Sequence, residues 1–141
     1  MRYLGIDLGD KRTGLALGDD ETGLIAPLDV IAARRGESLL AALLEAIDQQ
    51  RPAAIVIGLP INMDGTEGPA AKTSREFGEL LHHRSGLPVI YQDERLTSYA
   101  ADQHMAQTGR THKQKKQLRD ALAAAEILRD FFGAQFPEEQ Q

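Results

Sequence analysis

At 141 residues the chain has the usual length of one domain, enough to bury roughly 68 to 70 % of its unfolded surface around one core. Hydrophobic residues make up 42 % and charged residues 26 %, close to the globular average, which excludes a disordered or fibrous protein. The formal net charge of −5 excludes a uniformly basic surface, and the absence of cysteine excludes disulfides, thiolate zinc sites and a cysteine nucleophile. We expect a single domain over residues 1–141, in which any metal has oxygen or imidazole ligands.

The first residues of the chain predict three consecutive strands. Residues 2–9 and 13–19 are short apolar runs separated by a polar turn and punctuated by glycines, as a hairpin requires. A third run, at 24–33, contains Pro27, which lacks the N–H donor that a central strand needs and so indicates an edge strand.

The rest of the chain alternates between helices and strands. Residues 37–50 carry leucines at helical spacing, and residues 53–60 are a continuous apolar run typical of a strand covered on both faces. The further elements expected are a helix at about 69–84, a strand at 87–92, and helices at about 97–107 and 116–132.

This order of elements restricts the topology. Strands joined by short turns run antiparallel, whereas strands joined through helices run parallel. The order β-β-β-α-β-α-β-α-α therefore predicts an α/β fold whose mixed five-stranded sheet has three antiparallel and then parallel strands, with helices on both faces. This is the element order of the ribonuclease H-like fold.

Asp7 stands inside the first strand among apolar residues and glycines. A buried carboxylate without a partner is costly, so a cation or several donors must meet it. The alternative is an aspartate that bonds the backbone of the turn at Gly9.

Glu94 follows the strand at 87–92, and the ends of parallel strands are where ligand-binding groups gather in an open α/β sheet. The alternative here is a carboxylate that caps the next helix or pairs with Arg95.

Asp120 lies on the last predicted helix. At about 100° per residue it shares the apolar face of Ala124, Ile127 and Phe131. A carboxylate on a face that packs against a sheet is costly unless it has a function, which favours a site residue.

Three clustered carboxylates repel each other, and a divalent cation removes that conflict. Mg²⁺ or Mn²⁺ suits oxygen ligands, and two ions about 3.5 to 4 Å apart orient an attacking water and stabilise the leaving oxygen. Our hypothesis is that Asp7 bridges two ions while Glu94 and Asp120 each complete one side.

Four blocks of the sequence resemble a known family. They are GIDLGDKRTGLAL at 5–17, GLPINMDGTEG at 58–68, DERLTS at 93–98 and DALAAAEIL at 120–128. In their order and spacing they resemble the YqgF-type, RuvX-like proteins, which are described as Holliday-junction resolvases and as pre-16S ribosomal RNA nucleases. The resemblance implies that Asp7, Glu94 and Asp120 are the catalytic acids of a nuclease that matures the 5′ end of 16S ribosomal RNA. It does not separate RNA from branched DNA as the substrate.

Several polar residues are candidates for binding the substrate. Lys11 and Arg12 are at the hairpin tip, and the loop after the buried strand is Gly-rich, so its N–H groups suit a phosphate, although an ordinary loop before a helix explains it equally well. From 109 to 117 the chain has no aliphatic or aromatic residue, and we expect this basic segment to be mobile without ligand and to close over RNA. The candidates are Lys11, Arg12, Asn62, Asp64, Gly65, Arg95, Arg110, Lys113, Lys115 and Lys116.

Two other functions fit parts of the sequence. A sugar-kinase-like phosphotransferase has a similar first hairpin but needs a second domain, and a non-catalytic module would bind RNA in ribosome assembly while keeping the acids as a vestige. Charges interrupt the N-terminus before a signal-peptide core, and no apolar run approaches the roughly 18 residues of a membrane helix. We therefore expect a cytoplasmic monomer or homodimer with a nucleic-acid partner and no membrane partner.

Overall fold

The computed structural model describes residues 1–94 and 112–135. Its elements in chain order are β1 (Arg2–Asp7), β2 (Thr13–Asp19), β3 (Ile25–Ile31), α1 (Glu37–Gln50), β4 (Ala54–Leu59), α2 (Pro69–Ser85), β5 (Val89–Asp93) and α4 (His112–Gln135).

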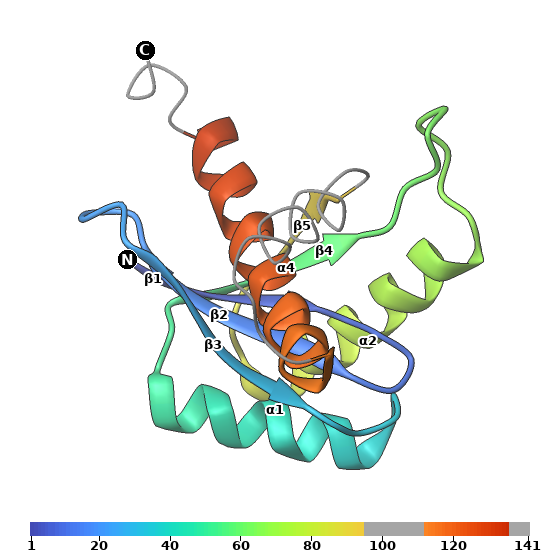
Figure 1. Ribbon diagram of the computed structural model, residues 1–141, viewed down its shortest axis with the longest axis horizontal. Helices are drawn as coiled ribbons and strands as arrows, with labels where there is room; N and C mark the ends of the chain where they lie inside the picture. The colour runs from blue at the N-terminus through green and yellow to red at the C-terminus, as the bar shows by residue number, and fades with distance from the viewer. Residues whose placement is uncertain (95–111, 136–141) are drawn as a thin grey trace.

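The strands form one mixed sheet in the order β3-β2-β1-β4-β5 (Figure 1). The β1 strand pairs antiparallel with β2, and β2 pairs antiparallel with β3. On the other side, β4 runs parallel to β1, and β5 runs parallel to β4. The predicted topology is confirmed, and β3, which contains Pro27, is the edge strand that was expected.

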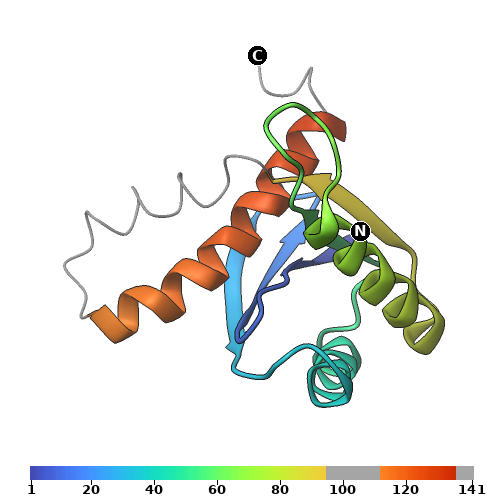
Figure 2. The ribbon, with the colours of Figure 1, turned by 90° about the vertical axis from the view of Figure 1, so that its right-hand side faces the viewer.

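Helices cover both faces of the sheet. Figure 2 shows α4 on one side and α1 with α2 on the other. On the α4 side the core combines alanines and other aliphatic side chains with aromatic rings. Tyr3 is in edge contact there with Phe131 and Phe132. On the other side, leucines of α1 and α2 pack against the branched side chains of β1 and β4. All six residues of β4 are buried, as its continuous apolar sequence predicts.

Several element boundaries differ from the predicted ones. The first strand ends at Asp7 rather than at residue 9, and the third covers Ile25–Ile31 rather than 24–33. The fifth strand covers Val89–Asp93 rather than 87–92, and α4 begins at His112 rather than near 116. The helix begins early because Lys and Gln are good helix formers even without apolar spacing. The helix predicted at 97–107 lies outside the described residues.

Within residues 1–94 and 112–135, none of the helices combines the length and the apolar character that crossing a membrane requires.

Candidate active site

Two of the predicted acids lie at the same end of the sheet. Asp7 is the last residue of β1, and Glu94 directly follows β5. The parallel strand β4 lies between them, and the backbone N–H of Glu94 donates to the carbonyl oxygen of Leu59 over 3.2 Å. The carboxyl ends of β1, β4 and β5 therefore form one edge that carries both side chains.

Glycines bring α4 against this end of the sheet. A Cβ built at Gly5 would lie 2.9 Å from the carbonyl oxygen of Ala124 in α4, and one built at Gly14 would overlap the carbonyl group of Asp120. Gly14 pairs with Asp7 in the β1–β2 register. Since side chains alternate along a strand, Asp7 is on the same face as Gly5. Asp120 therefore sits across from Asp7 on the helix that covers that face.

Asp7 and Glu94 are joined by a side-chain hydrogen bond. Burial raises the pKa of Glu94 to about 9, and the charge and hydrogen bond of Asp7 and the charge of Asp93 add to this rise. Burial also raises the pKa of Asp7 to about 6, the hydrogen bond from Glu94 lowers it, and the charge of Asp120 raises it. At neutral pH the pair therefore holds one proton, mainly on Glu94.

The third acid has a different partner. The Nε of Arg12 donates to Oδ2 of Asp120 over 2.7 Å, and the two form an ion pair. The side chain of Asp120 is 18 % exposed and that of Arg12 is 37 % exposed. Asp120 is thus partly withdrawn from solvent and neutralised by a residue of the β1–β2 turn.

The chemistry of this site fits a hard divalent cation. Asp7 and Glu94 supply carboxylate oxygens that would repel each other if both were ionised, and a cation removes that repulsion. In the part of the chain that the structure describes, no three His, Asp or Glu side chains are grouped closely enough to hold one ion. Ligation by all three acids therefore requires Asp120 to turn away from Arg12.

Comparisons with known proteins show the family to which this chain belongs. The family model described as RuvX, Holliday junction resolvase, matches residues 1–134. The chain belongs to the RuvX family. A relative from Anaeromyxobacter sp. (strain Fw109-5), named "Putative pre-16S rRNA nuclease", is 41 % identical over 128 residues, which cover 91 % of this chain and 93 % of the relative. A relative of the same name from Dechloromonas aromatica (strain RCB) is 40 % identical over 129 residues, which cover 92 % and 88 %.

Solved structures confirm the fold. RuvC of Thermus thermophilus in complex with a Holliday junction superposes with a TM-score of 0.61 at 19 % identity, covering 96 % of each chain. This likeness confirms the predicted ribonuclease H-like arrangement. The family match and the named relatives confirm the predicted family and its nuclease activity.

The loop between β4 and α2 of this RuvX-family chain projects from the same end of the sheet (Figure 1). Three of its N–H groups are bonded inside the loop: Asn62 N–H donates to the carbonyl of Thr66, Gly65 N–H to the carbonyl of Asn62, and Thr66 N–H to Oδ1 of Asp64. These three bonds within the loop fit the ordinary loop that the sequence left open as the alternative to a phosphate site. Asn62, Asp64 and Gly65 take part in them.

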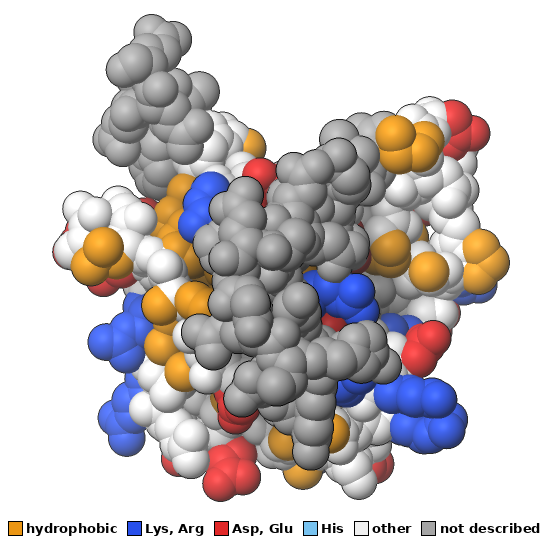
Figure 3. Space-filling view, viewed as in Figure 1, with side chains coloured by type: hydrophobic (Ala, Val, Ile, Leu, Met, Phe, Trp, Pro, Cys, Tyr) orange, Lys and Arg blue, Asp and Glu red, His pale blue; other side chains and the backbone are white. Residues whose placement is uncertain are grey.

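The remaining cationic candidates divide into two groups. Lys11 is exposed beside Arg12 at the hairpin tip. Arg95 and Arg110 lie outside the described residues, and Lys113, Lys115 and Lys116 are placed only as positions in the first turns of α4. On the face that carries α4, the described Lys and Arg side chains are interspersed with acidic and apolar ones (Figure 3). The described residues on this face therefore form no continuous basic surface.

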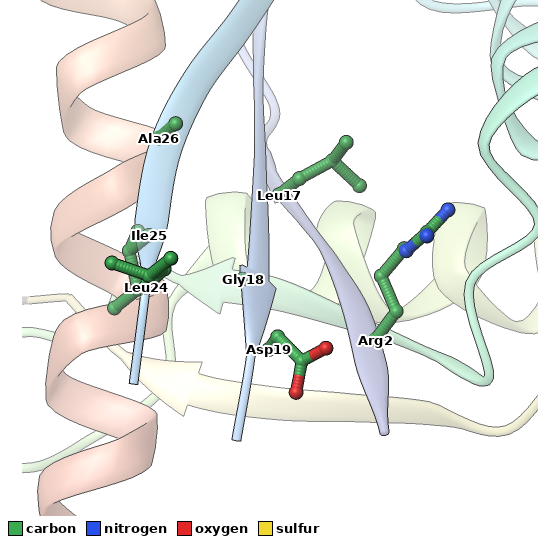
Figure 4. Close-up of a pocket in the computed structure, with 7 residues that line it drawn as sticks. All are labelled: Arg2, Leu17, Gly18, Asp19, Leu24, Ile25 and Ala26. Atoms are coloured by element: carbon green, nitrogen blue, oxygen red, sulfur yellow. The ribbon is translucent and has the colours of Figure 1, made fainter. Parts of the chain in front are cut away.

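A cavity of about 200 Å³ lies at the opposite end of the sheet, where Arg2 pairs with Asp19. Figure 4 shows Leu17, Leu24 and Ile25 among its lining side chains. It contains none of the predicted site residues.

The sequence interpretation missed Gly58. A Cβ there would lie 2.5 Å from Oε2 of Glu94 and would overlap Ile127. A usable signal was present, because a glycine inside a continuous apolar strand often marks a close approach of another group.

Proposed function

We propose that this RuvX-family chain is a nuclease that depends on Mg²⁺ or Mn²⁺ and hydrolyses phosphodiester bonds in the precursor of 16S ribosomal RNA, at its 5′ end. The observation that carries the proposal is the hydrogen-bonded pair of Asp7 and Glu94 at the end of the parallel strands, with Asp120 facing it from α4. Its place is the cytoplasm, and the unit is a single domain, as monomer or homodimer.

Each acid has a separate task in this proposal. Asp7, on the central strand β1, would hold the cations together with Glu94 on one side and Asp120 on the other. Bound divalent cations would supply a nucleophilic water and stabilise the departing oxygen. Glu94 must lose its proton before it can serve as a ligand, because metal ligands bind in their deprotonated form.

The Lys and Arg side chains are proposed to hold the substrate. Lys11 and Arg12 lie on the turn next to Asp7 and contact the backbone near the scissile bond. Arg95, Arg110, Lys113, Lys115 and Lys116 contact phosphates farther along the strand, and this electrostatic contact depends on salt. Asn62, Asp64 and Gly65 give the projecting loop a fixed shape beside the substrate path.

RNA is the preferred substrate because the relatives at about 40 % identity carry a ribosomal RNA nuclease name. Branched DNA is the second candidate, since the family model is described as a Holliday junction resolvase. A non-catalytic RNA-binding module is the third.

One cleavage assay separates the three. Purified protein is incubated with a 5′-extended 16S precursor or a four-way DNA junction, with Mg²⁺ or Mn²⁺ and with EDTA. Asp7→Asn should abolish cleavage, whereas the matched variant Asp10→Asn, an exposed acid in the same hairpin, should retain it. Binding without cleavage by the wild type under every condition would establish the non-catalytic module instead.

A further inference from the structure

Arg12 and Asp120 are 108 positions apart in sequence but are held together by one hydrogen bond of 2.7 Å between Nε and Oδ2. No other hydrogen bond or ion pair of Arg12 occurs within the described part of the chain. Its two terminal amino groups therefore have no described partner. Arginine–carboxylate pairs are strongest when two N–H groups of the guanidinium bond both carboxylate oxygens. Arg12 bonds Asp120 through Nε alone and lacks that bidentate geometry.

The backbone is closely packed around this contact. A Cβ at Gly9 would overlap the carbonyl oxygen of Arg12, and one at Gly14 would overlap that of Asp120. The β1–β2 turn is therefore tight, and the start of β2 lies directly against the backbone of α4 at Asp120. The side chain of Arg12 is 37 % exposed, so it reaches solvent while it bonds Asp120.

Asp120 is also within electrostatic reach of the acid pair, because its charge raises the pKa of Asp7. A divalent cation bound by Asp7 and Glu94 would thus compete with Arg12 for the same carboxylate. The guanidinium carries one positive charge, whereas Mg²⁺ or Mn²⁺ carries two.

We propose that Arg12 is a displaceable counter-ion, which neutralises Asp120 in the metal-free protein and gives this carboxylate up when a divalent cation binds. The inference rests on the proposed metal-dependent function. It makes Arg12 a positioning residue for Asp120 and leaves the released guanidinium at the mouth of the site, where a substrate phosphate is its natural partner.

The first test measures binding of Mn²⁺ alone, without nucleic acid, by the electron paramagnetic resonance signal of the free ion. Arg12→Gln removes the competing charge, so the dissociation constant for Mn²⁺ should fall about fivefold or more. Lys11→Gln makes the same charge change one residue away, on a side chain that does not touch Asp120, and should change it less than about twofold. Arg12→Lys keeps a cation and should stay near the wild-type value.

The outcomes distinguish this inference from the proposed function. If the wild type takes up no Mn²⁺, the metal-dependent function fails and the inference fails with it. If the wild type binds Mn²⁺ but Arg12→Gln binds it no tighter, or more weakly, only the inference is overturned. A lower affinity would mean that Arg12 merely supports the shape of the site.

A second test measures the wild type and uses the charge-conserving variant Arg12→Lys only to assign one signal. In nuclear magnetic resonance spectra the Nε–H of Arg12, identified by its loss in Arg12→Lys, should be protected from exchange with water in EDTA. Saturating Mg²⁺ should remove that protection. Protection that persists at saturation would show that Arg12 remains on Asp120, which overturns the proposal.

Discussion

Gly58 lies directly against the carboxyl group of Glu94. A Cβ built at Gly58 would lie 2.5 Å from Oε2 of Glu94, which is inside van der Waals contact, and would also overlap Cδ1 of Ile127. The strand β4 is otherwise filled with Ala, Ile, Val and Leu, so this one residue makes room for an acid that belongs to the neighbouring strand. The position of Glu94 therefore depends on the absence of a Cβ at Gly58.

We expect Gly58→Ala to destabilise the protein by about 1 to 3 kcal/mol, the usual cost of overpacking a core, and to reduce cleavage because Glu94 must move. Gly68→Ala is the control, since a Cβ at Gly68 meets nothing closer than 3.5 Å. A denaturant titration in the presence of EDTA measures the stability of each variant, and the cleavage assay measures its activity. Equal losses in the two variants would show that the contact at Gly58 is not limiting.

Much of this site was predictable from local periodicity. The helical face assigned to Asp120 is the one that packs on the sheet: Ala124 and Ile127 are fully buried and Phe131 nearly so. The strand order also follows from which strands are joined by turns and which by helices, and it predicts that Asp7 and Glu94 share an edge.

What could not be predicted depends on contacts between distant segments. Neither the pairing of Arg12 with Asp120 nor the proton shared by Asp7 and Glu94 has a signal in spacing, because each depends on side-chain conformations set by the folded structure. The start of α4 was misjudged for a different reason. Residues 112–116 carry no apolar residue, and apolar periodicity is what indicates a packed helix.

The metal-free protein should lose stability as the pH rises. Burial raises the folded-state pKa of Asp7 from 3.8 to about 6 and that of Glu94 from 4.5 to about 9. The folded protein thus keeps protons that the unfolded chain releases. The stabilising contribution of these two acids is complete below their unfolded-state pKa values, and it is lost as the pH rises through about 6 and then about 9.

Glu94→Gln isolates that effect, because the amide does not titrate. In EDTA, the difference in unfolding free energy between Glu94→Gln and the wild type should shift in favour of the variant from pH 5 to pH 9. Denaturant titrations at several pH values measure it. Parallel pH profiles would show that Glu94 does not carry the raised pKa.

Binding of Mg²⁺ should release a proton at neutral pH. Glu94 is protonated there and must ionise before it can act as a ligand, so about one proton should leave per chain. Calorimetric titration at pH 7 in two buffers of different ionisation enthalpy measures the number directly. The affinity for Mg²⁺ should also increase from pH 6 to pH 9, whereas Glu94→Gln should release no proton. Proton-free binding by the wild type would place the cation away from Glu94.

The basic segment should account for much of the salt dependence of RNA binding. Helix α4 begins at His112, so Lys113 and Lys116 are seven and four positions before Asp120, within about two turns of the acidic edge. Replacing Arg110, Lys113, Lys115 and Lys116 by Gln should reduce the slope of log affinity against log salt by up to about 3, since each phosphate contact on a single strand contributes about 0.7. The control is the double variant Arg51→Gln, Arg84→Gln, because both residues are exposed at the C-terminal ends of α1 and α2. A slope that changes as much in the control as in the fourfold variant would show a general loss of charge rather than a lost contact with phosphates. A change confined to the fourfold variant would place the RNA along the start of α4.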